Sequence, residues 1–322
     1  MKNHWKQILT FLVLSSVLTE LLSSNAPISV FFQPVVLLIL LTVGYGFPIL
    51  VIREIAIRKN LGLLGLFFLG IMYGFYNEAL VAKTIFNPFH SPFDTFAAYG
   101  LIGNIRVPWA LAITFWHALY AVIYPILFVG YLFPRSATES WVGKKTTWVL
   151  GIVSLLYGVL AFFNGTPEVP PGGLSHFIFI VISCALLWWL SGRVAKMPKP
   201  SQAVSVPFSW KSPGLGLLLY VALFFLPFIF SLFQLAPVFF IAYFALITLV
   251  GIRKLSRVPE VSLQKMVLVG LGGEIALALF VGVLMLFAGN VVVVMQSLIF
   301  IIIFAIAILK MRKKLKSVPV PV

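Results

Sequence analysis

Residues 291–309 read VVVVMQSLIFIIIFAIAIL, a stretch without a charged side chain, and five of the next seven residues are lysine or arginine. A helix of about 20 apolar residues spans the hydrocarbon of a bilayer. A basic cluster next to such a helix indicates the cytoplasmic side of the membrane. This stretch therefore predicts a transmembrane helix that ends in the cytoplasm, and similar stretches recur along the chain.

The composition agrees with a membrane protein. Of the 322 residues, 61% are hydrophobic and 10% are charged, whereas soluble domains are about half apolar and a quarter charged. We therefore predict an all-α polytopic integral membrane protein, with residues 1–322 forming a single membrane domain of about ten transmembrane helices. The predicted spans are residues 8–23, 35–57, 61–84, 108–133, 147–164, 174–192, 213–232, 236–252, 266–288 and 291–309.

The positive charges follow this segmentation. With ten spans and a cytoplasmic N-terminus, 21 of the 23 lysines and arginines fall on the cytoplasmic side, and the exceptions are Lys83 and Arg106. We expect both termini to be cytoplasmic, in the cell membrane, with the basic loops against anionic headgroups. Residues 193–212 are predicted to form a cytoplasmic linker between a six-span and a four-span part. Although the net charge is +15, no soluble module is present to bind nucleic acid.

Two carboxylates lie toward the outer ends of predicted spans. Charges within spans are costly and usually face a bundle interior or cavity. Glu20 has a serine- and threonine-rich face, and Glu78 lies about 10 Å below the outer end of its span. Gly70 and Gly74 form a GxxxG pattern that allows another helix to approach closely. The polar residues on that side of the helix are Tyr73 and Asn77.

Two further ionisable residues lie deeper. His117 is about 14 Å into span 108–133, and it shares a helical face with Tyr120 and Tyr124. Glu274 is about 13 Å into span 266–288, where small residues repeat every four positions. A buried carboxylate is either protonated or paired. We predict one intramembrane polar site for these residues, with packing and individual hydrogen bonds as the alternative. The site is predicted to contain Glu20, Tyr73, Asn77, Glu78, His117, Tyr120, Tyr124 and Glu274.

Other polar residues are assigned to the ends of the spans. The long outer loop supplies His90, Asp94 and Arg106 as further candidates for a site at the outer face. Glu54 and Arg58 form an i, i+4 pair, which we interpret as interfacial anchoring.

The chain has no GxxxxGK[ST], HExxH, CxxC or GxSxG motif, which argues against an ATPase or a common hydrolase. We predict no metal and no cofactor.

Three functions remain open. The first is a proton-coupled transporter or permease of an unknown small molecule, in which Glu274 and His117 take protons. The second is an intramembrane enzyme that acts on a lipid or a membrane-embedded substrate at an outer-side Glu/His pocket. The third is a non-catalytic scaffold or assembly factor. A cavity that joins Glu274 to His117 favours transport, whereas an outer pocket around Glu78, His117 and His90 favours an enzyme.

Overall fold

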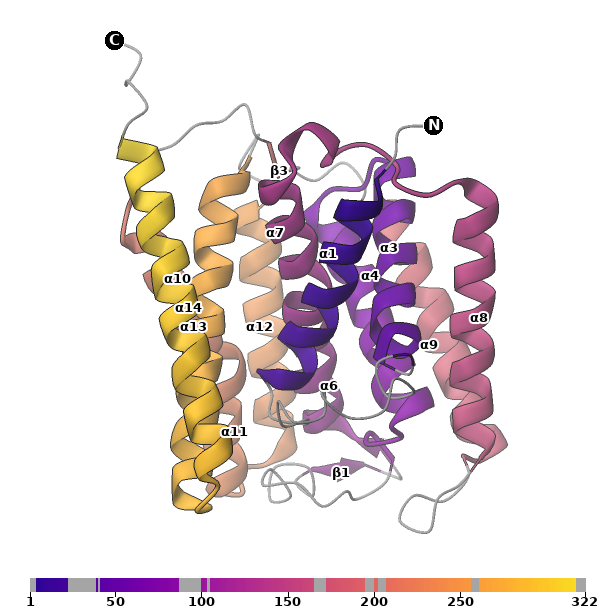
Figure 1. The fold of residues 1–322 in the computed structure, drawn as a ribbon. Helices are drawn as coiled ribbons and strands as arrows, with labels where there is room; N and C mark the ends of the chain where they lie inside the picture. Colours follow the sequence, from indigo (N-terminus) through magenta and orange to yellow (C-terminus); the bar gives the residue numbers. More distant parts are fainter. Residues whose placement is uncertain are drawn as a thin grey trace.

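The computed structural model of the chain describes residues 4–22, 39, 41–86, 100–102, 105–164, 172–194, 200–201, 207–255 and 261–316. These residues form a bundle of long helices that run alongside one another (Figure 1). The prediction of an all-α polytopic membrane protein is confirmed.

The first part of the chain is folded around the bundle centre. Its helical elements are α1 (Trp5–Ser16), η1 (Val17–Leu21), η3 (Thr42–Gly46), α3 (Phe47–Arg58), α4 (Leu63–Phe75), η4 (Tyr76–Val81), α6 (Val107–Trp116), η5 (His117–Ile123), α7 (Tyr124–Leu132), η6 (Pro134–Ser136), α8 (Lys144–Phe163) and α9 (Leu174–Arg193). The η elements are π-helical, apart from η6, which is a 3₁₀ turn. Each π-helical segment adjoins an α-helix, so α1–η1, η3–α3, α4–η4 and α6–η5–α7 are continuous helices.

The last part of the chain supplies four further long helices. They consist of α10 (Lys211–Tyr220), the π-helical η7 (Val221–Phe225) and α11 (Leu226–Leu232), followed by α12 (Pro237–Leu255), α13 (Leu263–Phe287) and α14 (Val291–Lys316). Short strands accompany them: β1 (Leu101–Ile102) pairs antiparallel with β2 (Ile105–Arg106), and β3 (Pro200–Ser201) pairs in parallel with β4 (Val261–Ser262). The interval between α9 and α10 lies within residues 193–212, whose role as a cytoplasmic linker stays a prediction.

Eight helices within the described residues are long and apolar enough to cross a membrane. They are Leu63–Val81, Val107–Leu132, Lys144–Phe163, Leu174–Arg193, Lys211–Leu232, Pro237–Lys254, Leu263–Phe287 and Val291–Leu315. The other two predicted spans, 8–23 and 35–57, overlap the shorter helices α1–η1 and η3–α3. The number of ten spans stays a prediction, as does the division into six and four.

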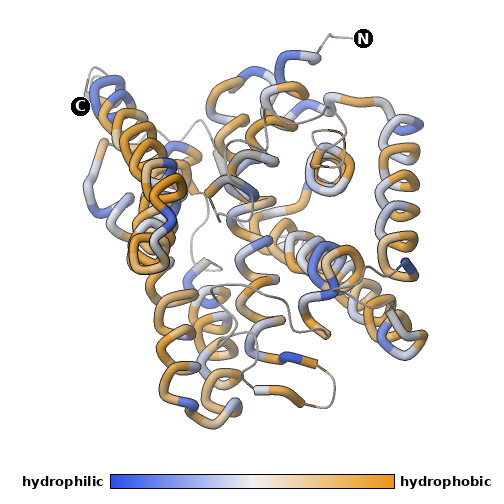
Figure 2. Tube along the Cα trace, turned by 60° about the horizontal axis from the view of Figure 1, so that its bottom comes forward, coloured by the Kyte–Doolittle hydropathy of each residue, from blue (hydrophilic) through white to orange (hydrophobic). Residues whose placement is uncertain are grey.

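The helices differ in how deeply they are buried. Val107–Leu132 lies at the centre and is mostly buried, whereas Leu174–Arg193 and Pro237–Lys254 lie at the periphery and are mostly exposed. The outward faces of the peripheral helices carry large apolar side chains such as Trp148, Ile182 and Phe239. Hydrophobic residues dominate the length of the helices in Figure 2. Exposed apolar surface of this extent is what a bilayer accommodates and water does not.

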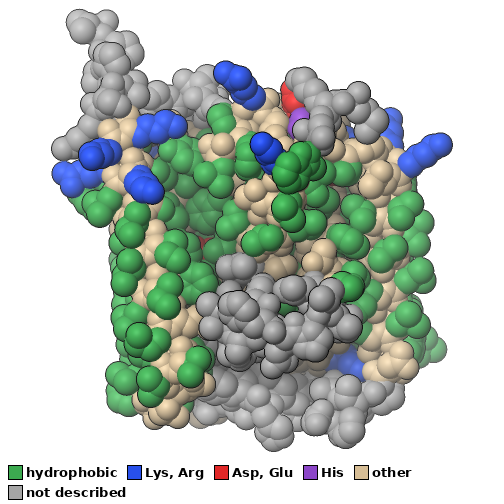
Figure 3. All heavy atoms as spheres, viewed as in Figure 1, with side chains coloured by type: hydrophobic (Ala, Val, Ile, Leu, Met, Phe, Trp, Pro, Cys, Tyr) green, Lys and Arg blue, Asp and Glu red, His purple; other side chains and the backbone are tan. Residues whose placement is uncertain are grey.

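Most of the lysine and arginine side chains lie at one end of the bundle. Helix α1 begins and α14 ends at the same end of the bundle (Figure 1), which we call the terminal end. Lysine and arginine side chains gather there in Figure 3. The opposite end, which we call the far end, carries β1 and β2.

Candidate functional site

Several of the predicted polar residues lie in π-helical segments. Of the five such segments in the described chain, η1 contains Glu20, η4 contains Asn77 and Glu78, and η5 contains His117; a fourth segment, η3, contains Tyr45, which was not predicted. The i→i+5 bonds that define such turns are present, for example from the Ala82 N–H to the Asn77 carbonyl at 2.8 Å. π-Turns interrupt a helix and are frequent at functional sites.

Two glycines bring these segments together. A Cβ added to Gly70 would lie 2.6 Å from the Cα of Ala118, and one added to Gly74 would lie 2.7 Å from the Cα of Thr114. No real side chain tolerates such distances, so the backbones of α4 and α6–η5 are in contact here because both positions are glycine. The approach places the turn that follows Gly74 against His117.

The central contact of the site joins Glu78 and His117. The His117 Nε2 atom lies 2.8 Å from Glu78 Oε1, and both residues are buried. The Asn77 amide nitrogen lies 3.1 Å from the same His117 Nε2 and 3.4 Å from Glu78 Oε1. A carboxylate, an imidazole and an amide from two helices therefore lie within hydrogen-bonding distance of one another.

A tyrosine extends this contact to a second carboxylate. The Asn77 Nδ2 atom donates to the Tyr45 hydroxyl at 3.1 Å, and the Tyr45 side chain hydrogen-bonds with Glu20. We refer to Glu20, Tyr45, Asn77, Glu78 and His117 as the interior cluster. It draws on four separate helices, and its connections run entirely through side chains.

Further side chains hold the interior cluster in place. The Tyr73 hydroxyl donates to the Gly44 carbonyl at 3.1 Å, and the Tyr73 ring stands edge-on to His117 with centroids 5.5 Å apart. On the side toward the far end, the Thr84 hydroxyl donates to Glu78 Oε2 and accepts from the Trp109 indole nitrogen at 3.0 Å. Both carboxylate oxygens of Glu78 therefore have partners.

The two ring nitrogens of His117 have different surroundings. Nε2 faces Glu78 and Asn77, whereas Nδ1 is buried and has no hydrogen-bond partner among the described residues. If Glu78 is ionised, an Nε2–H donates to it and Nδ1 carries the lone pair. If the carboxyl is protonated, it donates to Nε2 and Nδ1 carries the hydrogen. The second state holds one proton more than the first, so the pair can take up or release a proton at Nδ1 while its Nε2–Oε1 hydrogen bond is kept.

Glu274 does not join this cluster. It is fully buried on α13, and among the described residues neither carboxylate oxygen has a hydrogen-bond partner. No hydrogen bond or ion pair between described residues links Glu274 to His117. Tyr120 and Tyr124 lie beside the Glu274 helix and not beside Glu78. The single site predicted from the sequence is thus two groups of residues in the structure.

The outer-face candidates divide in the same way. His90 and Asp94 lie outside the described residues. Arg106 is buried at the start of α6, and its backbone N–H donates to the Ile85 carbonyl at 3.0 Å. Lys83, the other basic residue predicted on the outer side, donates to the carbonyls of Ala161 and Asn164 at the end of α8. Both cations that depart from the positive-inside pattern are therefore buried at element ends.

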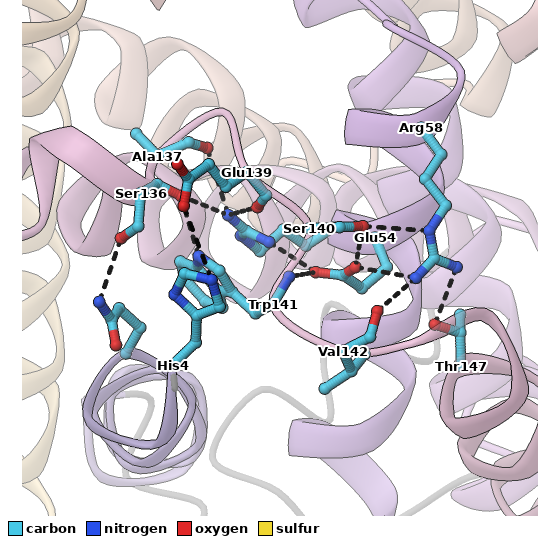
Figure 4. Close-up of polar contacts among 12 residues, drawn as sticks. His4, Glu54, Arg58, Ser136, Ala137, Glu139, Ser140, Trp141, Val142 and Thr147 are labelled. Atoms are coloured by element: carbon cyan, nitrogen blue, oxygen red, sulfur yellow. Dashed lines mark hydrogen bonds and ion pairs between the residues drawn. The ribbon is translucent and has the colours of Figure 1, made fainter. Parts of the chain in front are cut away.

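The interpretation of Glu54 and Arg58 as an interfacial anchor is incomplete, because the structure buries the pair in a larger network (Figure 4). The predicted i, i+4 contact exists at 3.2 Å, but Glu54 is 0% exposed. Its carboxylate also accepts from Arg53 at 2.6 Å, from the Ser140 hydroxyl at 2.6 Å and from the Trp141 N–H at 2.9 Å.

Arg53 completes this network, which we call the Arg53–Glu54 network. Its guanidinium donates to the backbone carbonyls of Ser136, Ala137 and Glu139 at 3.0–3.3 Å. It also lies over the Trp141 ring, 3.2 Å from the centroid. Every charge here has partners, so the network fastens the loop after α7 to α3 and has no free group for chemistry.

Sequence reasoning missed Tyr45, Thr84 and Trp109. A lone tyrosine between Gly44 and Gly46 is a weak signal, and nothing local distinguishes Thr84 or Trp109 from ordinary interfacial residues. Within the described ranges, no group of three or more His, Cys, Asp or Glu residues could hold a metal ion.

Comparisons with known proteins agree with the architecture. A family model described as an uncharacterized membrane protein family matches residues 9–317. An uncharacterized protein from Archaeoglobus fulgidus is 30% identical over 166 residues, and the match covers 49% of this chain and 49% of that protein. The chain thus aligns with about half the length of this relative. No solved structure matches.

Proposed function

We propose, from the geometry of the interior cluster, that the chain, which belongs to this uncharacterized membrane protein family, is a proton-coupled transporter. The observation that carries this proposal is the buried Glu78–His117 pair at 2.8 Å, joined through Asn77 and Tyr45 to a second carboxylate, Glu20. Ionisable residues at this depth usually belong to a substrate or proton pathway.

The charge of the cluster changes with each proton. Two carboxylates and one imidazole have a net charge of −2, −1, 0 or +1, depending on how many protons they hold. Burial makes those protonation states costly in which the net charge has no counter-charge nearby. Uptake or loss of a proton must therefore rearrange hydrogen bonds among α1–η1, η3–α3, α4–η4 and α6–η5. The residues of the interior cluster belong to these helices, so protonation of the cluster can change how the helices pack.

The π-turns offer a way to move. A π-turn contains one residue more than the α-turn it replaces, and shifting it along the helix rotates the side chains beyond it. Since Glu20, Tyr45, Glu78 and His117 all lie in such turns, a local shift would remake their contacts without unfolding a helix. Transporters use broken or irregular helices at their binding sites in a comparable manner.

We place the termini in the cytoplasm and the protein in the cell membrane. Lysines and arginines are concentrated at the terminal end (Figure 3), as the positive-inside rule requires for a cytoplasmic face. These residues would contact anionic headgroups. Glu78, linked to Thr84 and Trp109 on the far side, then faces the outer half of the membrane.

A second function, an intramembrane enzyme, is favoured by one observation. His117 Nε2 is held by Glu78 while Nδ1 has no partner among the described residues. A carboxylate that orients an imidazole whose other nitrogen is available is the arrangement of a general base. The substrate would then be a lipid or membrane-embedded molecule. Mass spectrometry of lipids incubated with wild type and His117→Ala would reveal a product that only the wild type forms.

The test of transport compares wild type, Glu78→Gln and His117→Ala in sealed liposomes under an imposed pH gradient. A pH-sensitive dye inside reports proton entry, and Glu139→Gln serves as a matched charge control in a loop outside the interior cluster. Because a missing substrate can silence flux, infrared difference spectra between acidic and neutral pH provide a second reading of proton binding. We expect Glu78→Gln to lose flux and the infrared band of a buried carboxyl group, whereas Glu139→Gln should keep both and lose at most the band of a partly exposed carboxyl group. Unchanged flux and unchanged spectra in Glu78→Gln would refute the proposal.

A further inference from the structure

Glu274 is a buried carboxylate that lies outside the interior cluster. It is 0% exposed, its two carboxylate oxygens have no hydrogen-bond partner among the described residues, and no described lysine, arginine or histidine forms an ion pair with it. An ionised carboxylate in such surroundings requires a positive charge beside it.

Aromatic side chains surround this part of α13. A Cβ added to Gly273 would lie 2.9 Å from the Tyr120 hydroxyl oxygen, and one added to Gly270 would lie 3.0 Å from the Tyr124 ring. The two tyrosines therefore rest directly on the α13 backbone, one beside Glu274 and one a turn away. Glycine at both positions makes this approach possible.

A third tyrosine closes the arrangement from α10. The Tyr220 ring lies 6.1 Å from the Tyr120 ring at 85°, and the Tyr124 ring lies 5.0 Å from Tyr120 at the same interplanar angle. Phe224 packs against both Tyr120 and Tyr220, with centroids 5.7 and 5.3 Å away. Glu274 is near enough to act electrostatically on all three tyrosines. We call Glu274, Tyr120, Tyr124, Tyr220 and Phe224 the aromatic box.

The hydroxyls of the three tyrosines resemble the carboxylate in one respect. Buried tyrosines ordinarily find a hydrogen-bond partner, as Tyr73 does here with the Gly44 carbonyl. In the described part of the chain, none of the hydroxyls of Tyr120, Tyr124 and Tyr220 forms a hydrogen bond. Four polar side chains on three helices thus converge without bonding to one another, which is the composition expected of a site whose ligand completes it.

We propose that the aromatic box is a binding site for an organic ammonium ion, either a quaternary ammonium or a protonated amine. The carboxylate of Glu274 neutralises the cation, and the faces of Tyr120, Tyr124 and Tyr220 provide cation–π contacts. A hydrated metal ion would use oxygen ligands and gain little from the aromatic walls.

The box and the interior cluster are separate, so binding and proton handling can be measured independently. The aromatic box also indicates which substrate class the transporter would carry, namely an organic cation. This inference about the substrate rests on the proposed function. A cation bound at Glu274 replaces a proton as the counter-charge of this carboxylate, without any covalent change.

The experiment measures binding to the purified full-length protein in detergent, by calorimetry and thermal shift. The probes are tetramethylammonium, choline, sodium at matched ionic strength, and 3,3-dimethylbutan-1-ol, the uncharged isostere of choline. We expect the ammonium probes to bind and stabilise, while sodium and the alcohol do not. Glu274→Gln and Tyr220→Leu should each weaken binding about tenfold or more, whereas Glu139→Gln and Tyr243→Leu, outside the box, should retain it.

Several outcomes would overturn the proposal. Equal binding of the alcohol and choline would show an apolar cavity, and absence of binding by every ammonium probe would leave Glu274 as a protonated carboxyl alone. Retained affinity in Glu274→Gln also refutes the site. If Glu274→Gln fails to fold, Tyr220→Leu decides: loss of binding supports the box and retention overturns it. Unchanged proton flux and unchanged spectra in Glu78→Gln, together with choline binding that depends on Glu274, would refute the transport proposal alone and leave the aromatic box standing.

Discussion

Substitution of Glu54 by glutamine should strongly destabilise the protein. The change preserves side-chain volume, so no cavity forms, but it removes the carboxylate that lies 2.6 Å from the Arg53 guanidinium. Arg53 is 1% exposed and Glu54 is 0% exposed, so water cannot replace the lost charge. Breaking a buried pair by removing one partner costs about 3–5 kcal/mol, and we expect a loss in this range.

The assay is equilibrium unfolding in mixed micelles titrated with sodium dodecyl sulfate, followed by circular dichroism. Tryptophan fluorescence adds a local probe, because Trp141 is stacked on the Arg53 guanidinium. Arg58→Gln is the matched control. Its side chain is 25% exposed, so water screens the loss and about 1–2 kcal/mol is expected. A loss below about 1 kcal/mol for Glu54→Gln, or a loss equal to that of Arg58→Gln, would refute the assignment of a desolvated pair.

Three further substitutions test other contacts. Gly74→Leu should push α4 away from Thr114, destabilise the protein by about 1–3 kcal/mol and abolish proton binding at the interior cluster. Gly151→Ala, whose added Cβ would make an ordinary contact of 3.9 Å with Val51, should unfold like wild type in the same titration. Tyr45→Phe should uncouple Glu20 from Asn77, altering the carboxyl infrared bands at a stability cost of about 1 kcal/mol; unchanged bands would contradict the connection. Lys83→Met should expose the last carbonyls of α8 and cost about 1 kcal/mol, visible as faster amide hydrogen exchange at that helix end; unaltered exchange would exclude a capping role.

Much of the fold could be predicted because the bilayer restricts the possibilities. An apolar stretch such as residues 291–309 must satisfy its backbone internally, so it becomes a helix wherever it lies in the membrane. The predicted spans consequently overlap helices throughout the described chain. The close approach predicted at Gly70 and Gly74 is present for the same local reason, since only glycine permits it. The orientation of the termini and the number of spans stay predictions.

The groupings among polar residues were harder to predict. Helical periodicity assumes 3.6 residues per turn, and the π-turns that contain Glu20, Tyr45, Glu78 and His117 depart from it. A face drawn on an ideal helix therefore does not show which residues meet. It placed His117 with Tyr120 and Tyr124, whereas the structure bonds His117 to Glu78 and leaves the tyrosines beside Glu274.

The sequence by itself thus determined the class of protein, the helices and the residues whose burial is costly, because transfer from water to hydrocarbon acts on each residue separately. Only the tertiary structure decided which of those residues share a site. Burial of Glu54 depends on the loop that carries Ser140 and Trp141, more than 80 positions away. Isolation of Glu274 depends on which helices pack against α13. Such contacts form between segments that are distant in the sequence. Their energies depend on both residues of a pair, so the sequence around either residue alone does not reveal them.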